Sequence, residues 1–235
     1  MTIKTQLHLR NNSFKSLVYI LNIETATRNC SVSVAKNGET VLCKEIAELG
    51  YSHAEKLHVF IEEILNEASI KVQDLSAVAV SKGPGSYTGL RIGVSAAKGL
   101  SYALGIPLIS IDTLQVLAKQ VKGKSGKIIP MIDARRMEVY SATFDANHQY
   151  LKEVHAEVLT QNSYNDEDDV IYFVGDCQEK CQTVLTKDNF IFIPEIIFPS
   201  AHEMSEISFE KYKANIFEDV AYFEPFYLKD FLLNK

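Results

Sequence analysis

Hydrophobic positions in the first half of the chain change between a spacing of two, typical of strands, and the spacing of an amphipathic helix. The Asn37-Gly38 pair separates two strand-like runs and is a strong hairpin signal. Ser52 precedes the first helical run with Glu55 three positions later, as in a capping box. The pattern predicts strands over 17–23, 30–35, 41–49, 75–80 and 106–111, and helices over 53–68 and 88–104. This order indicates an α/β lobe with a mixed sheet.

The second half of the chain opens in the same way. An apolar strand over 128–132 ends at Asp133, and a second strand reaches a turn near Asn147. In the first half Glu24 ends the first strand, and its distance along the chain to the Asn37 turn is similar. This weak internal duplication predicts two similar lobes.

The remaining segments are less regular. A strand is expected over 171–175, a helix over 178–186, and a turn leading into a helix after Phe198, whereas Pro225 interrupts the last helix candidate. We therefore divide the chain into a polar, disordered extension (1–16), an N-terminal lobe (17–112) and a C-terminal lobe (113–235).

Composition restricts the classes of partner. The chain of 235 residues has a formal net charge of −6, and this disfavours direct nucleic-acid binding because phosphates are held mainly by Lys and Arg. We see neither a signal peptide nor an apolar run of membrane-spanning length, so no membrane contact is expected.

Four cysteines lack the spacing of a disulfide framework: Cys30, Cys43, Cys177 and Cys181. Cys177 and Cys181 are four positions apart and would share a helix face as half of a metal site, but the sequence has no second pair. We interpret all four as ordinary reduced cysteines and place the protein in the cytoplasm.

The most distinctive segment is the glycine-rich run from Ser81 to Arg91, between a strand and a helix. Such a run either cradles a phosphate or is a turn that lets the helix approach the sheet, and it matches neither named nucleotide-binding fingerprint. Two strands end at an acidic residue, with Thr25 and Arg135 close by, and the role of these residues also has two interpretations. Glu24 and Asp133 could flank a nucleotide cleft between the lobes or simply cap turns.

The helix over 88–104 combines small residues with a polar stripe. Gly93 and Ala97 allow another backbone to approach, while Arg91 and Lys98 lie on one polar face. That face is either solvated or a partner surface. The chain has no H-E-x-x-H or G-x-S-x-G motif and no Cys/His ligand cluster, so we assign no catalytic or metal-binding residue.

Several segments carry a resemblance to a known family. ILNIETATRNCSVSV, SHAEKLHVFIEEIL, AVAVSKGPGSYTGLRIGVSAAKGLSYALGIPLISI and MIDARRMEVY, with FPSAHEM and PFYLKDF later, resemble the small paralogues of the catalytic subunit of bacterial tRNA threonylcarbamoyladenosine synthase. The resemblance implies an actin/Hsp70-like (ribonuclease H-like) fold of two lobes. Catalytic members carry an H-x-x-x-H metal pair, and here Thr113 and Leu117 occupy those positions.

The resemblance also implies a scaffold that activates a catalytic, TsaD-like paralogue, with a small TsaE-like ATPase joining the pair and a homodimer when the chain is alone. Carried over by position, the interface residues would be Leu57, Ile61, Ile64, Arg91, Gly93, Ala97 and Lys98.

Nucleotide contacts would involve Glu24, Thr25, Asp133 and Arg135. The chain has no cofactor of its own on this interpretation, and ATP or ADP would bind in the assembled complex. Glu24 stands where the family more often has Asp, and its longer arm leaves less room in the cleft. The alternative function is a stand-alone metallopeptidase or sugar-kinase-like phosphotransferase of the same superfamily.

Overall fold

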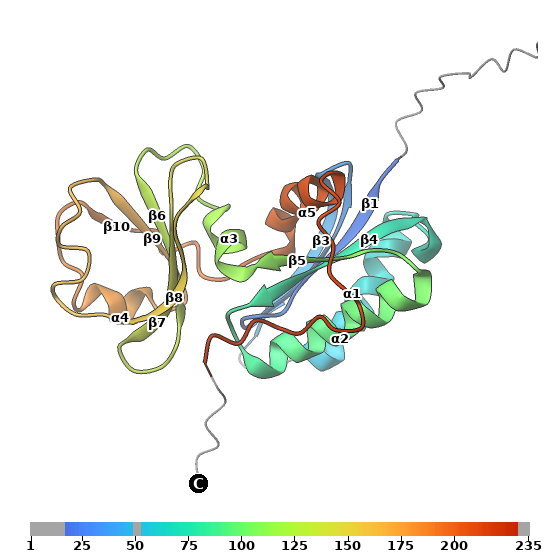
Figure 1. Cartoon of the computed structure of the whole chain (residues 1–235), viewed down its shortest axis with the longest axis horizontal. Coiled ribbons are helices and arrows are strands. Elements are labelled where there is room, and N and C mark those ends of the chain that lie inside the picture. The colour runs from blue at the N-terminus through green and yellow to red at the C-terminus, as the bar shows by residue number, and fades with distance from the viewer. Residues whose placement is uncertain (1–16, 49–52, 230–235) are drawn as a thin grey trace, which may run out of the picture.

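Two five-stranded sheets with the same strand topology form the framework of the protein (Figure 1). The computed structural model describes residues 17–48 and 53–229. The first sheet, ordered β3-β2-β1-β4-β5, contains β1 (Tyr19–Glu24), β2 (Asn29–Lys36), β3 (Glu39–Ala47), β4 (Leu75–Gly83) and β5 (Leu108–Asp112). The second, ordered β10-β9-β6-β7-β8, contains β6 (Lys127–Asp133), β7 (Glu138–Phe144), β8 (Tyr150–Val158), β9 (Ile171–Gly175) and β10 (Phe190–Phe192).

Each sheet has an antiparallel meander of three strands followed by two strands that pair in parallel. The duplication predicted from the sequence is therefore confirmed at the level of topology. The Asn37-Gly38 hairpin is also confirmed, since both residues have positive φ angles, of 53° and 90°.

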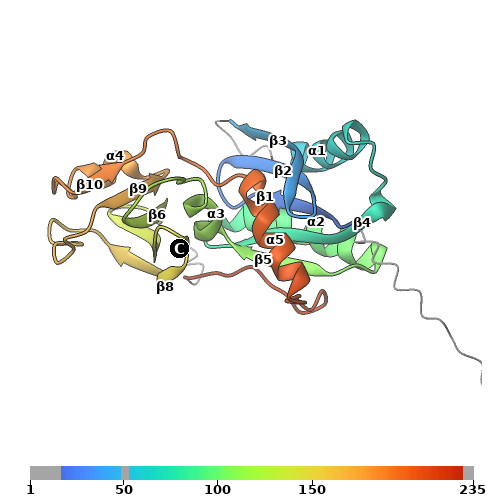
Figure 2. The same ribbon diagram turned by 90° about the horizontal axis from the view of Figure 1, so that it is seen from above.

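Helices cover the two sheets unequally. Helices α1 (His53–Glu67) and α2 (Tyr87–Leu104) lie on one face of the first sheet, and α5 (Met204–Lys213) lies on the other (Figures 1 and 2). In the described residues the second sheet is covered by shorter helices, among them α4 (Gln178–Gln182) in the connection from β9 to β10. Because the first sheet is covered on both faces, its central strands β1 and β4 are almost continuously buried.

The short helix α3 (Thr113–Ala118) connects the two lobes. Its Leu114 and Leu117 pack with the second sheet, whereas Val116 packs with the first sheet and α5. The helix therefore contributes to both cores, and the boundary expected after Asp112 falls at its start.

The chain returns to the first lobe after the second sheet, and this differs from the expectation that 113–235 forms one lobe. The 3₁₀ turn η2 (Ala201–Glu203) and α5 follow the FPSAHEM segment, and Met204 and Ile207 are buried against the first sheet. Side-chain burial therefore assigns this segment to the first lobe.

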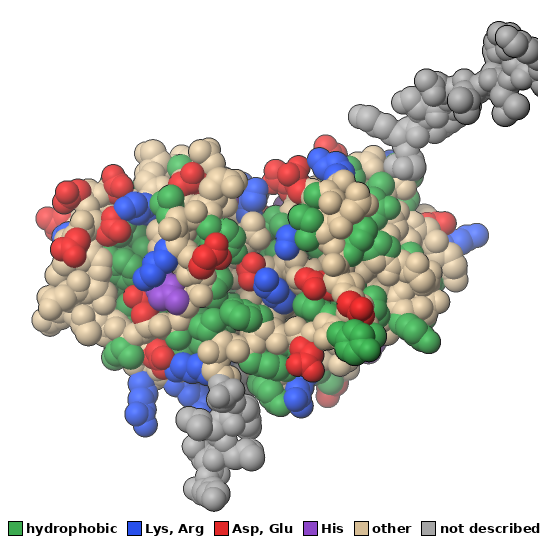
Figure 3. All heavy atoms as spheres, in the orientation of Figure 1, with side chains coloured by type: hydrophobic (Ala, Val, Ile, Leu, Met, Phe, Trp, Pro, Cys, Tyr) green, Lys and Arg blue, Asp and Glu red, His purple; other side chains and the backbone are tan. Residues whose placement is uncertain are grey.

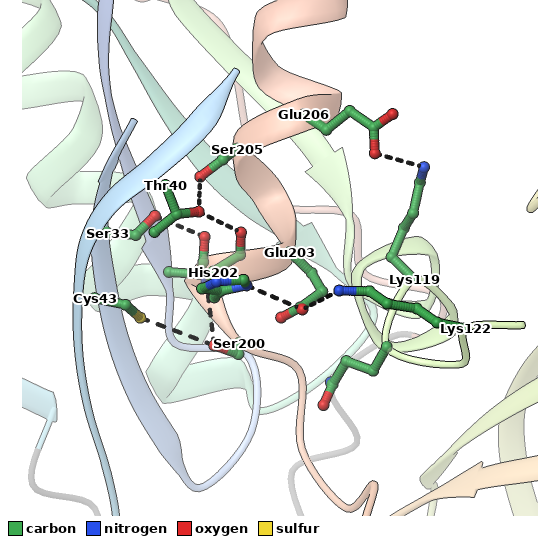
Figure 4. Close-up of polar contacts among 12 residues, drawn as sticks. Ser33, Thr40, Cys43, Lys119, Lys122, Ser200, His202, Glu203, Ser205 and Glu206 are labelled. Carbon is green, nitrogen blue, oxygen red and sulfur yellow. Dashed lines mark hydrogen bonds and ion pairs between the residues drawn. The ribbon is translucent and has the colours of Figure 1, made fainter. Parts of the chain in front are cut away.

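A polar seam anchors that return segment to the outer strands of the first sheet (Figure 4). The Ser200 hydroxyl donates to Glu45 Oε2 at 2.6 Å, and the Ser33 hydroxyl donates to the Ala201 carbonyl at 2.7 Å. Lys119, just after α3, pairs with Glu206 at 3.0 Å. This last pair is exposed and contributes little, so the buried hydroxyl contacts provide most of the anchoring.

Two predicted details lie outside the described residues, namely the extension over 1–16 and the Ser52 capping position. The helix expected over 178–186 is shorter and ends at Gln182.

Candidate functional site

Glu24 ends β1 in the interior of the first lobe. Its side chain is fully buried; the Ser81 hydroxyl donates to one carboxyl oxygen, and the Ala26 N–H donates to the other at 2.6 Å. Desolvation raises the pKa of Glu24 from 4.5 to about 7, although both hydrogen bonds act in the opposite direction. The carboxyl group is thus enclosed by its own chain.

The loop after Glu24 fills the space above the glycine-rich segment. The Thr25 hydroxyl donates to the Gly89 carbonyl at 2.8 Å, and Ser86 N–H donates to the Ala26 carbonyl at 2.7 Å. A Cβ atom on Gly89 would overlap the Thr25 carbonyl oxygen, and one on Gly93 would overlap the Thr25 hydroxyl. The glycines therefore permit close packing of α2 on β1, the second of the two interpretations of this segment.

Asp133 and Arg135 lie at the corresponding strand end of the second lobe. Asp133 is half exposed, pairs with the Lys180 ammonium group and accepts from the Arg135 N–H at 2.8 Å. Arg135 itself has a φ of 75°, a turn conformation. Both residues belong to a surface turn. This placement agrees with the turn-capping role, the second interpretation of these residues.

Two of the four residues expected to contact nucleotide are enclosed in this structure. Glu24 and Thr25 are buried with internal partners, and the space beside the glycines is filled by the chain's own carbonyl oxygens. Asp133 and Arg135 are exposed, so nucleotide contact through the four residues stays a prediction.

The raised pKa of Glu24 predicts a pH dependence of stability. Because the folded-state pKa of about 7 lies above the ordinary 4.5, the native state binds this proton more tightly. The resulting stability is fully present below pH 4.5 and is lost as the pH rises through 7. We expect the free energy of unfolding to fall by about 3 kcal/mol more in the native protein than in Glu24→Gln over this interval.

Urea denaturation at a series of pH values measures this difference. Glu62→Gln, which changes an exposed carboxylate on α1, serves as the control and should leave the slope unchanged. Equal slopes in the native protein and Glu24→Gln would show that Glu24 is ionised in the folded state near pH 5.

Five of the seven residues expected at a partner interface face inward instead. Leu57, Ile61, Ile64 and Ala97 belong to the core of the first lobe, and Gly93 packs against Thr25. A side chain fully enclosed by its own chain, as those of Leu57, Ile64 and Ala97 are, cannot contact a partner directly. Their role is to fix α1 and α2 on the sheet, with Ile61 also reaching the groove described next.

A groove of about 640 Å³ lies on the outer face of these two helices. Ala54, His58 and Ile61 of α1 line one side, and α2 lines the other with Ile92, Ala96 and Leu100, together with Ser95 and Gly99. The walls are mostly apolar and carry small residues. Sequence reasoning selected the helices and, among the lining residues, Ile61 and Arg91. It did not assign the other lining positions to an interface, although the small residues at 95, 96 and 99 were a signal for them.

Arg91 and Lys98 hold the C-terminal segment against α2. The Arg91 guanidinium lies 4.1 Å from the centre of the Tyr87 ring and donates to the Tyr227 hydroxyl at 3.3 Å. Lys98 donates to the Phe223 carbonyl at 2.7 Å. In Figure 1 this segment, in dark red, crosses α2 towards the second lobe. The polar stripe of α2 is thus an intramolecular contact that forms one edge of the outer face.

The two positions of the family's metal pair have no metal-binding character. Thr113 and Leu117 are both fully buried. In residues 17–48 and 53–229, no cluster of three or more His, Cys, Asp or Glu side chains is arranged to hold a metal ion. Likewise, none of the helices in this part of the chain is long and apolar enough to cross a membrane.

Charged groups are dispersed over the face shown in Figure 3. Acidic and basic side chains alternate there, and no continuous basic area is present on this face. This distribution agrees with the net charge of −6.

The duplicated sheets, the helix pair on one face and the interlobe helix define a two-lobe protein of the actin/Hsp70-like class. The model of the family TsaD, tRNA N6-adenosine threonylcarbamoyltransferase, matches residues 47–224. The chain belongs to this family, as the resemblance predicted, and several of its curated relatives carry the name TsaB.

Two relatives and one solved structure define the extent of the similarity. The "tRNA threonylcarbamoyladenosine biosynthesis protein TsaB" of Bacillus subtilis is 36% identical over 57% of this chain and 58% of its own length. The protein of the same name from Buchnera aphidicola is 31% identical over 74% of this chain and 83% of its own. YeaZ from Pseudomonas aeruginosa has a similar structure, with a TM-score of 0.78, 21% identity and coverage of 90% of this chain and 100% of its own. The match to the Bacillus relative thus spans little more than half of that protein's length.

Proposed function

We propose that this chain is a non-catalytic subunit in threonylcarbamoyladenosine biosynthesis, which pairs with a TsaD-like catalytic paralogue. That paralogue transfers the threonylcarbamoyl group to the adenosine beside the anticodon of tRNA. The observation that carries the proposal is the apolar groove on the outer face of α1 and α2, in a chain that belongs to the threonylcarbamoyltransferase family. Apolar grooves with small residues accommodate the side chains of a partner helix.

The scaffold role is supported by the residues at the family's metal positions. Thr113 and Leu117 offer no imidazole and are enclosed in the interlobe core, where a catalytic ion would need an open ligand position. A chain with this substitution would act through its partner's active site. Unpaired, it would form a homodimer through the same face.

Other components would complete the assembly. A small TsaE-like ATPase would join the pair, and ATP or ADP would be held with the help of the partner subunits, because Glu24 and Thr25 are enclosed. The catalytic subunit would supply the basic surface for tRNA, given this chain's net charge of −6. The assembly would work in the cytoplasm.

Size-exclusion chromatography with light scattering tests the proposal, using the full chain alone and mixed with the catalytic paralogue of the same organism. We expect a stable 1:1 complex. If the mixture shows no complex in the presence of ATP and the small ATPase, partner activation is excluded. Tight nucleotide binding by the isolated chain would then favour the phosphotransferase alternative.

A further inference from the structure

Three sulfur atoms meet in the core of the second lobe, outside every site described so far. Cys181 Sγ lies 3.6 Å from Cys177 Sγ and 3.7 Å from Met131 Sδ. The two cysteines belong to α4 and its N-terminal cap, while Met131 is on the neighbouring strand β6. The spacing of the two cysteines in the sequence indicates half of a metal site, but it does not identify Met131 as their neighbour.

The fold brings these sulfurs together through a close approach of two strands. Strands β6 and β9 pair in parallel, with Met131 opposite Gly175, the last residue of β9. Gly175 has a φ of 125°, and a Cβ atom there would overlap the Met131 carbonyl oxygen. This glycine lets the chain turn directly above Met131 and places the α4 cysteines over its thioether.

The two sulfur–sulfur distances from Cys181 are close to those between ligands of one metal ion. Metal–thiolate bonds of about 2.3 Å place two ligand sulfurs of a tetrahedral ion roughly 3.8 Å apart. The measured separations of 3.6 and 3.7 Å require only a small adjustment to reach that value. Thiolate and thioether sulfur together select soft Cu(I) over Zn²⁺, Mg²⁺ and other harder ions.

The surroundings offer partial compensation for the charge of such a site. Two thiolates and one monovalent cation carry a net charge of −1, and the Lys180 side chain lies in the same helix turn between the cysteines. Its ammonium group already contacts the carbonyl oxygens of Arg136 and Glu138, at 2.8 and 2.9 Å, and the Asp133 carboxylate.

We propose that Cys177, Cys181 and Met131 form a binding site for a soft monovalent cation, Cu(I), with two thiolates and one thioether as ligands. Binding displaces the two thiol protons, which leave to solvent, and the S–H···S contacts of Cys181 with Cys177 and Met131 are replaced by three metal–sulfur bonds. Cys181 is fully buried and Cys177 is 4% exposed, so the ion enters by a local opening of the short α4 turn.

Competition with the Cu(I) chelator bicinchoninate tests the site on the reduced, full-length chain under anaerobic conditions. We expect one equivalent of Cu(I) per chain and sulfur-only coordination in X-ray absorption spectra. Cys177→Ser and Cys181→Ser should each weaken binding at least 100-fold. Met131→Leu, which preserves the volume of the core, should weaken it about 10-fold.

The other two cysteines provide the matched control. A Cys30→Ser/Cys43→Ser double variant should retain full Cu(I) binding, and circular dichroism should show that each variant is folded. If the native chain yields all Cu(I) to the chelator, or if the control variant loses binding, the site is overturned. Preference for Zn²⁺ over Cu(I) would overturn the assignment of the ion. If a serine variant fails to fold, the Cu(I) affinity of Met131→Leu still tests the site.

Discussion

Gly89→Ala is expected to lower the free energy of unfolding by roughly 2 kcal/mol. The new Cβ atom would overlap the Thr25 carbonyl oxygen, which belongs to the backbone and cannot rotate away. Overpacking of this kind typically costs about 1–3 kcal/mol, and loss of the hydrogen bond from Thr25 to the Gly89 carbonyl would add to it. Urea denaturation of the isolated chain measures the change.

Gly99 provides a matched control on the same helix. A Cβ atom on Gly99 meets nothing within 4 Å, so Gly99→Ala should stabilise the chain by up to about 1 kcal/mol through helix propensity alone. The two variants should therefore change the free energy of unfolding in opposite directions. If Gly89→Ala is as stable as Gly99→Ala, the glycine-rich segment is not required for packing, and the phosphate-cradle interpretation regains support.

The regular elements of the first lobe could be predicted because their signals are local. Asn37-Gly38 requires positive φ angles, and helix α1 has an apolar stripe whose inward residues are those found in the core. The repeated order of strand, turn and hairpin was also sufficient to predict two lobes with a common topology.

Sequence reasoning predicted a helix after Phe198 but not where it packs, because that placement depends on long-range contacts. Helix α5 has a weak apolar pattern, and only its buried Met204 and Ile207 assign it to the first sheet. The C-terminal segment is held by Lys98 through backbone carbonyl groups, which any residue type provides. Neither feature has a sequence pattern that identifies its partner.

The predicted partner interface shows the same limit, namely that the sequence does not identify contacts between distant residues. Small residues at Gly93 and Ala97 correctly indicated a close approach to α2, but the approaching groups are Thr25 and the core of the same chain. Similarly, Glu24 was identified as a notable carboxyl, and only the structure shows that it is fully buried against Ser81. The sequence identifies unusual positions, but it does not show which groups they contact.

The outer face of α1 and α2 leads to the second large effect. Ser95 is exposed and lines the groove, so Ser95→Arg leaves the core of the free chain intact and puts a guanidinium group over apolar walls. A partner helix seated there would bury that charge without a counterion. We expect Ser95→Arg to weaken the heterodimer with the catalytic paralogue at least 100-fold, about 2.7 kcal/mol, as measured by isothermal titration calorimetry.

Val158→Arg provides a control with the same added charge. Val158 is 63% exposed on β8, in the second lobe and away from the groove, and its substitution should leave the affinity unchanged. Urea denaturation should give both variants the stability of the native chain, which separates a lost interface from a lost fold. If Ser95→Arg binds as tightly as the native chain, the partner occupies another face. The two variants add the same charge and differ only in their position relative to the groove. If Val158→Arg weakens binding as much as Ser95→Arg does, the effect therefore arises from net charge and not from a contact in the groove.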